Sequence, residues 1–145
     1  MRNLKEKSLK SKNVFKGRFL NVFQDEVSLP NGEKSIREFI KHPGVSACIP
    51  LLPDNKIALV KQHRYSINEE TIEIPAGKLH MNEDPKNCAL RELEEEIGFK
   101  SKKITYLTKI HPAVGFCDEV IWLYLAEELT RTSIKHDVDE FLEFI

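Results

Sequence analysis

A chain of 145 residues with a formal net charge of −1 is long enough for one domain with one sizeable core. Charged residues make up 31% of it and hydrophobic residues 41%, which is typical of a globular protein and not of a disordered chain. The longest purely apolar run, VIWLYLA at 120 to 126, is far shorter than the roughly 20 residues of a membrane-spanning helix. We therefore expect no membrane partner.

The first residues and the cysteines bear on the cellular compartment. The N-terminal stretch MRNLKEKSLKSKN has no apolar segment of the kind found in secretory signals. The 3 cysteines are an odd number without a Cys-x-x-Cys spacing, which is typical of reduced thiols. The 5 histidines show no metal-ligand spacing. Together these features predict a cytoplasmic protein.

Basic residues are concentrated at the start of the chain. Residues 1 to 13 carry five lysine and arginine side chains against one glutamate. Such a segment can contact nucleic acid or remain solvated, but nucleic-acid platforms place aromatic side chains among the basic ones, and this segment has none. We therefore expect a solvated tail over residues 1 to 13 and no nucleic-acid partner.

Alternating apolar and polar residues predict mostly strands along the rest of the chain. Two strands, at 17 to 29 and 34 to 42, flank a Pro-Asn-Gly turn and form an N-terminal hairpin within residues 14 to 43. A second hairpin is expected from 45 to 52 and 56 to 65. Further strands are expected at 71 to 77, at 103 to 111, at 120 to 126 and close to the C-terminus.

One helix is predicted between these strands, in the sequence DPKNCALRELEEEIG at 84 to 98. Asp84 stands where a side chain caps the first turn, Pro85 has the first helical position, and Gly98 follows the last turn. The apolar side chains form one stripe suited to packing on a sheet, made of Ala89, Leu90, Leu93 and Ile97. Residues 44 to 145 are thus expected to form a single α/β domain.

Three glutamates cluster beside this apolar stripe. Glu92, Glu95 and Glu96 are related by three or four residues, and like charges at these spacings cost about 0.2 to 0.5 kcal/mol per pair in a helix. A solvated acidic face would explain Glu94, which points away, but not the clustering of the other three. A divalent cation such as Mg²⁺ or Mn²⁺ would explain it, because these ions take oxygen ligands and share them with substrate phosphates.

The residues around the helix form a longer pattern, GKLHMNEDPKNCALRELEEEIGF at 77 to 99. It resembles the signature of the Nudix hydrolases, whose fixed positions are all matched here by Gly77, Glu83, Arg91, Glu92, Leu93, Glu95, Glu96, Gly98 and Phe99. The resemblance implies an α/β/α sandwich with a mixed β-sheet, joined to N-terminal antiparallel strands. Glu83 and Arg91 would form a structural pair that holds the loop against the helix, and Gly77 and Gly98 would be structural as well.

The same resemblance implies a metal-dependent hydrolase that cleaves a diphosphate joined to another group. Glu92 and Glu96 correspond to the principal Mg²⁺ ligands, with Mn²⁺ as a substitute. The backbone carbonyl of Ala76 corresponds to a further ligand, and Glu95 to a third ligand or a base that acts through water. Bound metal would neutralise the diphosphate and lower the pKa of the attacking water.

Sequences outside this motif resemble the ADP-ribose pyrophosphatase branch of the family. They are EIPAG before the motif, KQHRY on the preceding strand and GFCDEVIWLYLAEEL after it. The resemblance implies hydrolysis of ADP-ribose to AMP and ribose 5-phosphate, and a homodimer formed through the N-terminal strands. It also makes Glu119, in the loop after the motif, the expected general base, with Asp118 and Glu95 as alternatives. An ordinary loop charge is the other explanation of Glu119.

Four more residues match substrate-binding positions of that branch. Arg64 and Glu73 match two of them, and Phe19 matches an aromatic residue that stacks on adenine, although aromatic residues are also common in strand cores. Arg37 stands near a second stacking position, and a guanidinium can also stack on a base. Val114 stands where the branch has proline, a difference that bears on the shape of the loop and hence on the substrate.

Two further expectations concern function and chain length. The same chemistry could act on another nucleotide sugar, a dinucleoside polyphosphate or a damaged nucleoside triphosphate. A protein of another class, a Nudix-fold sensor that binds ADP-ribose or NAD-type ligands without cleaving them, would have lost the metal-ligand glutamates, which are all present here.

Members of the branch continue into another helix after a segment like DEFLEFI, so we expect the chain ending at Ile145 to lack that C-terminal helix.

Overall fold

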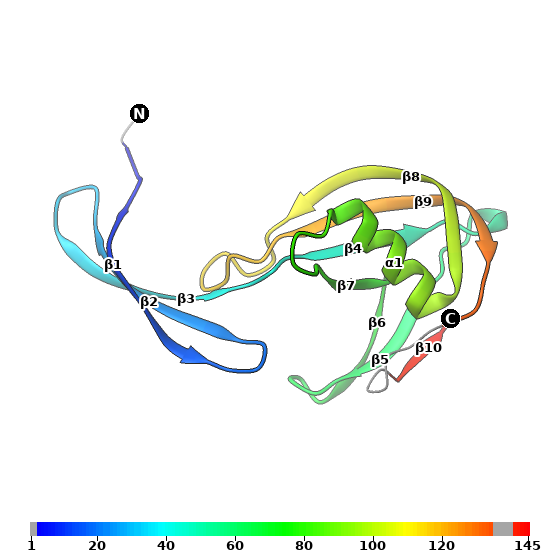
Figure 1. The fold of residues 1–145 in the computed structure, drawn as a ribbon, viewed down its shortest axis with the longest axis horizontal. Coiled ribbons are helices and arrows are strands. Elements are labelled where there is room, and N and C mark those ends of the chain that lie inside the picture. Colours follow the sequence, from blue (N-terminus) through cyan, green and yellow to red (C-terminus); the bar gives the residue numbers. More distant parts are fainter. Residues whose placement is uncertain (1–2, 135–140) are drawn as a thin grey trace. The chain divides into compact units, whose positions relative to one another are not determined.

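The computed structural model describes residues 3–134 and 141–145. Its elements are β1 (Lys7–Lys16), β2 (Asn21–Ser28), β3 (Lys34–Lys41), β4 (Val45–Pro50), a 3-10 turn (Pro53–Asn55), β5 (Val60–Arg64), β6 (Glu69–Glu73), β7 (Ala76–Lys78), α1 (Pro85–Ile97), β8 (Phe99–Ile110), β9 (Ile121–Arg131) and β10 (Leu142–Phe144) (Figure 1). They form two compact units, Met1–His42 with His111–Glu119, and Pro43–Ile110 with Val120–Ile145. None of the helices in the described part of the chain is long and apolar enough to span a membrane.

The first unit contains a three-stranded antiparallel sheet in the order β1-β2-β3. The predicted hairpin of β2 and β3 is confirmed, and its turn is closed by Gly32, whose backbone N–H donates to the carbonyl of Leu29 at 2.9 Å. Gly32 has a φ of +88°, a conformation that residues with a Cβ rarely adopt, so the Asn-Gly pair determines this turn locally.

Strand β1 differs from the expectation for this segment, which was a solvated tail over residues 1 to 13. Lys7–Lys16 pairs antiparallel with β2, with two irregularities in the register, and all of its residues are exposed. The side chains are therefore solvated as expected, but the backbone N–H and C=O groups are paired with the edge of β2. A strand without a buried face has no apolar alternation, which is why the sequence pattern did not reveal it.

The second unit is built on a mixed sheet in the order β7-β4-β9-β8. Strands β4 and β9 run parallel, and the other neighbours run antiparallel, so the predicted mixed α/β architecture is confirmed. Helix α1 packs on β4, β7 and β8 (Figure 1). The core beneath it consists of buried Cys48, Ala58, Val60, Ala89, Leu93, Ile97, Phe99, Tyr124 and Ala126. Of the predicted apolar stripe, only Leu90 lies outside this core and is half-buried.

The predicted hairpin between 45 to 52 and 56 to 65 is confirmed only beside its turn, and it is wrong for the strands β4 and β5. Strand β4 belongs to the mixed sheet and β5 to a second sheet in the order β10-β5-β6. Beside the turn, Leu51 and Ile57 form a bridge, the N–H of Leu52 donates to the carbonyl of Lys56, and the N–H of Ala58 donates to the carbonyl of Pro50. Pro50 has no N–H to continue a ladder, and the turn at Pro53–Asn55 redirects the chain into the other sheet. The strand predicted near the C-terminus is confirmed as β10.

Helix α1 begins and ends where its sequence predicts. The Asp84 carboxylate accepts hydrogen bonds from the backbone N–H groups of Lys86 and Asn87, at 2.9 and 3.3 Å, and Pro85 opens the helix. Gly98 adopts the left-handed conformation, with a φ of 67°, and its N–H donates to the carbonyl of Glu94. These caps fix the two ends of the helix.

Candidate active site

Two of the clustered glutamates are buried at the face of α1 that packs on the sheet. Glu92 and Glu96 are 7% and 5% exposed, respectively, and they stand one turn apart. Glu95 has a side chain that is 39% exposed, and Glu94 lies elsewhere, paired with Lys100 at 3.1 Å. Buried carboxylates are costly unless they are paired, so this pair of acids needs compensating groups.

Gly77 makes room for one of these carboxylates. An ideal Cβ on Gly77 would lie 1.8 Å from Oε1 of Glu92 and 2.0 Å from its carboxyl carbon. Strand β7 therefore passes so close to α1 that only a residue without a side chain leaves Glu92 in place. This close approach explains why the motif begins with glycine.

Arg91 is the cation at the centre of the acidic cluster. Its Nη1 donates to Oε1 of Glu92 at 2.6 Å and to Oε2 of Glu95 at 2.8 Å. On its other side, Nε and Nη2 donate to the two carboxylate oxygens of Glu83 at 2.9 and 3.1 Å. The structure thus pairs Glu83 with Arg91, as the sequence predicted, and ties the loop before α1 to the helix.

The contact between Glu83 and Arg91 shifts the pKa values of both groups. The hydrogen bond from Arg91 is the main cause that lowers the pKa of Glu83 to about 2, and the backbone N–H of His80 contributes a further hydrogen bond at 2.9 Å. In return, Glu83 is the main cause of a raised pKa of Arg91. Both groups are therefore charged at neutral pH, and Arg91 is fixed where it can orient Glu92.

Glu96 is held by the neighbouring strand instead of by Arg91. The backbone N–H of Ala76, on β7, donates to Oε2 of Glu96 at 3.1 Å. Burial raises the pKa of the nearby thiol of Cys48, and the charges of Glu96 and Glu92 raise it further. Burial likewise raises the pKa of Cys88 to about 12. The thiols near the two glutamates, Cys48 on β4 and Cys88 on α1, are therefore neutral at pH 7.

This donor set fits a hard divalent cation that shares its ligands with a substrate. Among the residues that the structure describes, no three histidine, cysteine, aspartate or glutamate side chains converge to enclose a metal ion. Mg²⁺ is usually held by only one or two carboxylates, together with waters and phosphate oxygens. Glu92 and Glu96, beside the backbone of Ala76, supply that number of carboxylates.

Arg64 and Glu73 come together on the second sheet, on the neighbouring strands β5 and β6. Nε of Arg64 donates to Oε1 of Glu73 at 2.7 Å, and the hydroxyl of Thr71 donates to the same oxygen. This contact is the main cause of a raised pKa of Arg64 and a lowered pKa of Glu73. The Arg64 side chain is 47% exposed, so it remains accessible to a ligand.

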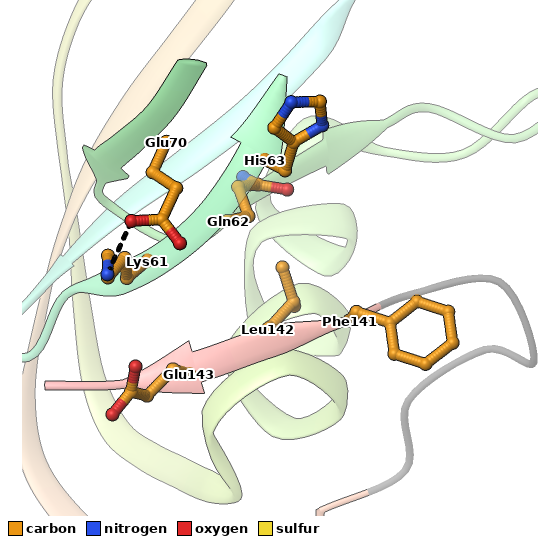
Figure 2. Close-up of a pocket in the computed structure, with 7 residues that line it drawn as sticks. All are labelled: Lys61, Gln62, His63, Glu70, Phe141, Leu142 and Glu143. Atoms are coloured by element: carbon orange, nitrogen blue, oxygen red, sulfur yellow. Dashed lines mark ion pairs between the residues drawn. The ribbon is translucent and has the colours of Figure 1, made fainter. Parts of the chain in front are cut away.

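A hollow lies elsewhere on the β10-β5-β6 sheet. It has a volume of about 450 Å³ and is lined by Lys61, Gln62, His63, Glu70 and residues 141 to 143 (Figure 2). Lys61 and Glu70 form an ion pair across it at 2.6 Å. None of the residues predicted for the site lines this hollow, and two of its charged groups, Lys61 and Glu70, are engaged with each other.

The remaining predicted residues belong to the first unit. Phe19 is 42% exposed, so it is not a core residue, and its ring meets the ring of His42 edge-on at 5.3 Å. The guanidinium of Arg37 is bound by the carboxylate of Glu6, at 2.6 and 3.0 Å. In the loop at 111 to 119, Asp118 accepts a hydrogen bond from the backbone N–H of His42 at 2.7 Å. Asp118 therefore has a structural task.

The chain also matches known families along nearly all of its length. The family model described as "NUDIX domain" matches residues 41–144, and the one described as "Nucleoside diphosphate sugar hydrolase N-terminal domain" matches residues 6–40. The chain belongs to the Nudix family. The resemblance seen in the motif at 77 to 99 is thereby confirmed, and the protein is an enzyme of the Nudix hydrolase type.

Individual relatives agree with this assignment. The Nudix hydrolase described here is 42% identical over 140 residues to the ADP-ribose pyrophosphatase of Bacillus subtilis (strain 168), covering 97% of this chain and 76% of that protein. It is also 42% identical over 142 residues to the methanol dehydrogenase activator of Bacillus methanolicus, covering 97% and 77% of the two chains. A solved structure of an ADP compounds hydrolase superposes with a TM-score of 0.86 at 20% identity, covering 100% of this chain and 80% of that one, which shows a shared fold.

Three residues that touch the predicted positions were not singled out by the sequence. Glu6 binds Arg37 from 31 residues away, and His42 meets Asp118 across 76 residues. His111 contacts the backbone of Glu119. A glutamate in a basic segment and histidines without metal-ligand spacing carry no local signal, so only the folded chain reveals these contacts.

Proposed function

We propose that this Nudix hydrolase converts ADP-ribose and water to AMP and ribose 5-phosphate in the presence of Mg²⁺. The observation that carries the proposal is the burial of two carboxylates, Glu92 and Glu96, side by side against β7, with Arg91 holding one of them. The Bacillus subtilis relative named as an ADP-ribose pyrophosphatase, at 42% identity, supports the choice of substrate.

In this proposal, Glu92, Glu96 and the carbonyl of Ala76 would hold the metal, with Glu95 as a further ligand. The metal would supply charge neutralisation of the diphosphate and a lowered pKa of the attacking water. Arg91 keeps Glu92 oriented through its 2.6 Å hydrogen bond. Mn²⁺ has the same preference for oxygen ligands and would substitute.

Proton transfer is assigned to the loop at 111 to 119. Glu119 would take a proton from the attacking water, whose oxygen forms a bond to one phosphorus while the P–O bond that joins this phosphorus to the bridging oxygen breaks, and the two halves leave as AMP and ribose 5-phosphate. Asp118 is the weaker candidate, because its carboxylate already accepts a hydrogen bond from the backbone of His42. Glu95, paired with Arg91 at 2.8 Å, is the other alternative.

Substrate binding is assigned to the residues that match substrate-binding positions of the ADP-ribose pyrophosphatase branch. Phe19 would stack on adenine, and Arg37 would contact the nucleoside. Arg64, oriented by Glu73, would bind the phosphates. These assignments rest on exposure and on the sequence resemblance, and each can be tested by substitution.

The test of the proposed activity is product analysis. The protein is incubated separately with ADP-ribose, ADP-glucose, NADH, diadenosine tetraphosphate and 8-oxo-dGTP, with Mg²⁺ or with EDTA. AMP that appears fastest from ADP-ribose, and only with metal, supports the proposal. Faster cleavage of another compound would refute the substrate but keep the hydrolase site, and silence on all five would favour a ligand-binding role.

We further propose that the enzyme is a cytoplasmic homodimer formed through the N-terminal sheet. Phe15 and Ile36 on this sheet are 54% and 51% exposed, and β1 presents an edge strand, which favours association. Cys48 and Cys88 are buried free thiols, in keeping with a reducing compartment. Sedimentation that shows only monomer at micromolar concentration would contradict the dimer.

A further inference from the structure

The side chain of His42 lies beside Glu119 within the first unit. Nε2 of His42 is 3.8 Å from Oε1 of Glu119, and the two side chains are only 10% and 22% exposed, respectively. On the other side of the loop, Nδ1 of His111 lies 2.9 Å from the carbonyl oxygen of Glu119 and donates to it. Both the carboxylate and the backbone of Glu119 therefore meet an imidazole.

The loop that carries Glu119 does not depend on the His42 side chain for its position. Backbone groups join it to the end of β3, since Ile40 donates to the carbonyl of Phe116 at 2.8 Å and accepts from the N–H of Asp118 at 3.2 Å. Asp118 in turn accepts from the backbone N–H of His42, which any residue except proline would supply. Hydrogen bonds to backbone groups therefore anchor the loop, and the imidazole is not needed for this.

The imidazole ring is itself fixed by a neighbour. Phe19 contacts it edge-on, with ring centroids 5.3 Å apart and an interplanar angle of 85°. Such an arrangement is the favoured geometry for an aromatic pair. With Phe19 on one side and Glu119 on another, the ring has a defined orientation toward the carboxylate.

We propose that His42 is a positioning residue that holds the Glu119 carboxylate through its Nε2–H group. This inference rests on the proposed role of Glu119 as general base. A distance of 3.8 Å is longer than a hydrogen bond, and such catalytic contacts are often long in the free enzyme and tighten when substrate binds. Held by one oxygen, the carboxylate keeps its other oxygen for the proton of the attacking water.

The test compares kcat and KM for ADP-ribose in His42→Leu, His42→Gln, Glu119→Gln and the double variant His42→Leu/Glu119→Gln. We expect His42→Leu to lower kcat about 10- to 100-fold with little change in KM, because misplacing a catalytic group costs about this much. His42→Gln keeps an N–H donor and should recover part of the rate. The matched control, His63→Leu, removes an exposed histidine on β5 and should leave kcat unchanged.

The double variant separates positioning from a merely structural effect. If His42 acts through Glu119, its loss costs nothing further in the Glu119→Gln background. An equal loss of kcat in both backgrounds, or a rise in KM alone, would overturn the proposal. Glu119→Gln with wild-type kcat would overturn the role of Glu119 as base, and the positioning role with it.

A second measurement does not depend on the substrate. Glu119→Gln should shift the side-chain ¹⁵N resonances of His42 in the NMR spectrum of the free protein. The control Lys109→Gln, which replaces an exposed lysine earlier in the sequence, should not shift them. Unshifted resonances in Glu119→Gln would show that the two side chains do not interact in solution. This result would refute the positioning role even if ADP-ribose proved to be the wrong substrate.

Discussion

Gly77 and Glu92 approach each other so closely that no side chain fits between β7 and α1 at this point. A Cβ on Gly77 would lie 1.8 Å from Oε1 of Glu92, well inside van der Waals contact. The first residue of the motif and its first acidic ligand candidate are therefore parts of one packing arrangement.

Gly77→Ala should therefore impair activity by displacing Glu92. We expect a loss of kcat of about 100-fold, the cost of misplacing a catalytic group, and a destabilisation of about 1 to 3 kcal/mol from overpacking. Urea unfolding and kcat measure the two effects. Gly115→Ala is the control for stability, because its Cβ would meet nothing within 4 Å. Wild-type kcat in Gly77→Ala would show that the Glu92 carboxylate is not needed in this position.

Glu96→Gln should abolish turnover while sparing the fold. The glutamine side chain keeps an oxygen that can accept from the N–H of Ala76, so the packing against β7 persists. We expect kcat to fall at least about 100-fold, because charge stabilisation by a bound metal is worth several kcal/mol. The melting temperature without metal should be unchanged, and its rise on adding Mg²⁺ should be lost.

Glu94→Gln is the matched control for that variant. Glu94 stands on the same helix but pairs with Lys100 and not with the acidic cluster. It should retain both the activity and the stabilisation by Mg²⁺. Near wild-type activity in Glu96→Gln would instead show that Glu96 does not bind the metal.

The Glu83–Arg91 pair should make stability depend on pH in acid. The folded-state pKa of Glu83, about 2, lies below its ordinary value of 4.5, so the pair contributes stability that is fully present above pH 4.5 and is lost as pH falls toward 2. The free energy of unfolding of Glu83→Gln should be lower than that of the wild type by about 1 to 2 kcal/mol at pH 7. Urea unfolding between pH 3 and 7 should show this difference shrinking below pH 4.5. A difference that stays constant with pH would contradict the assignment.

Arg64→Lys should weaken substrate binding more than it weakens the fold. Lysine keeps the charge but loses the planar fork that Glu73 orients, so we expect KM to rise about 10-fold with a smaller change in kcat. A half-exposed ion pair contributes at most about 1 kcal/mol to stability, so the melting temperature should change little. Lys61→Met removes the cation of the neighbouring ion pair with Glu70 and should leave KM unchanged. A KM unaltered in Arg64→Lys would remove Arg64 from the binding site.

Local sequence determined several features of this protein outright. The caps of α1 at Asp84 and Gly98 and the turn at Gly32 follow from side-chain chemistry and backbone freedom within one turn of chain. The helix period alone places the glutamates at 92, 95 and 96 on one side of α1, and this clustering requires no distant partner. These features were predictable because their causes lie within a few residues.

Tertiary structure decided the features whose causes lie far apart in the chain. Strands β4 and β5 lie in different sheets because β4 pairs in parallel with β9, in a register that begins with Val45 opposite Ile121. The pairing of β1, which has no buried face, depends on the open edge of β2. Whether a carboxylate is buried beside Arg91, as Glu92 is, or only half-buried, as Glu95 is, depends on the close passage of β7 at Gly77. Periodicity places a residue on a face of its own element, but only the packing of elements determines what that face meets.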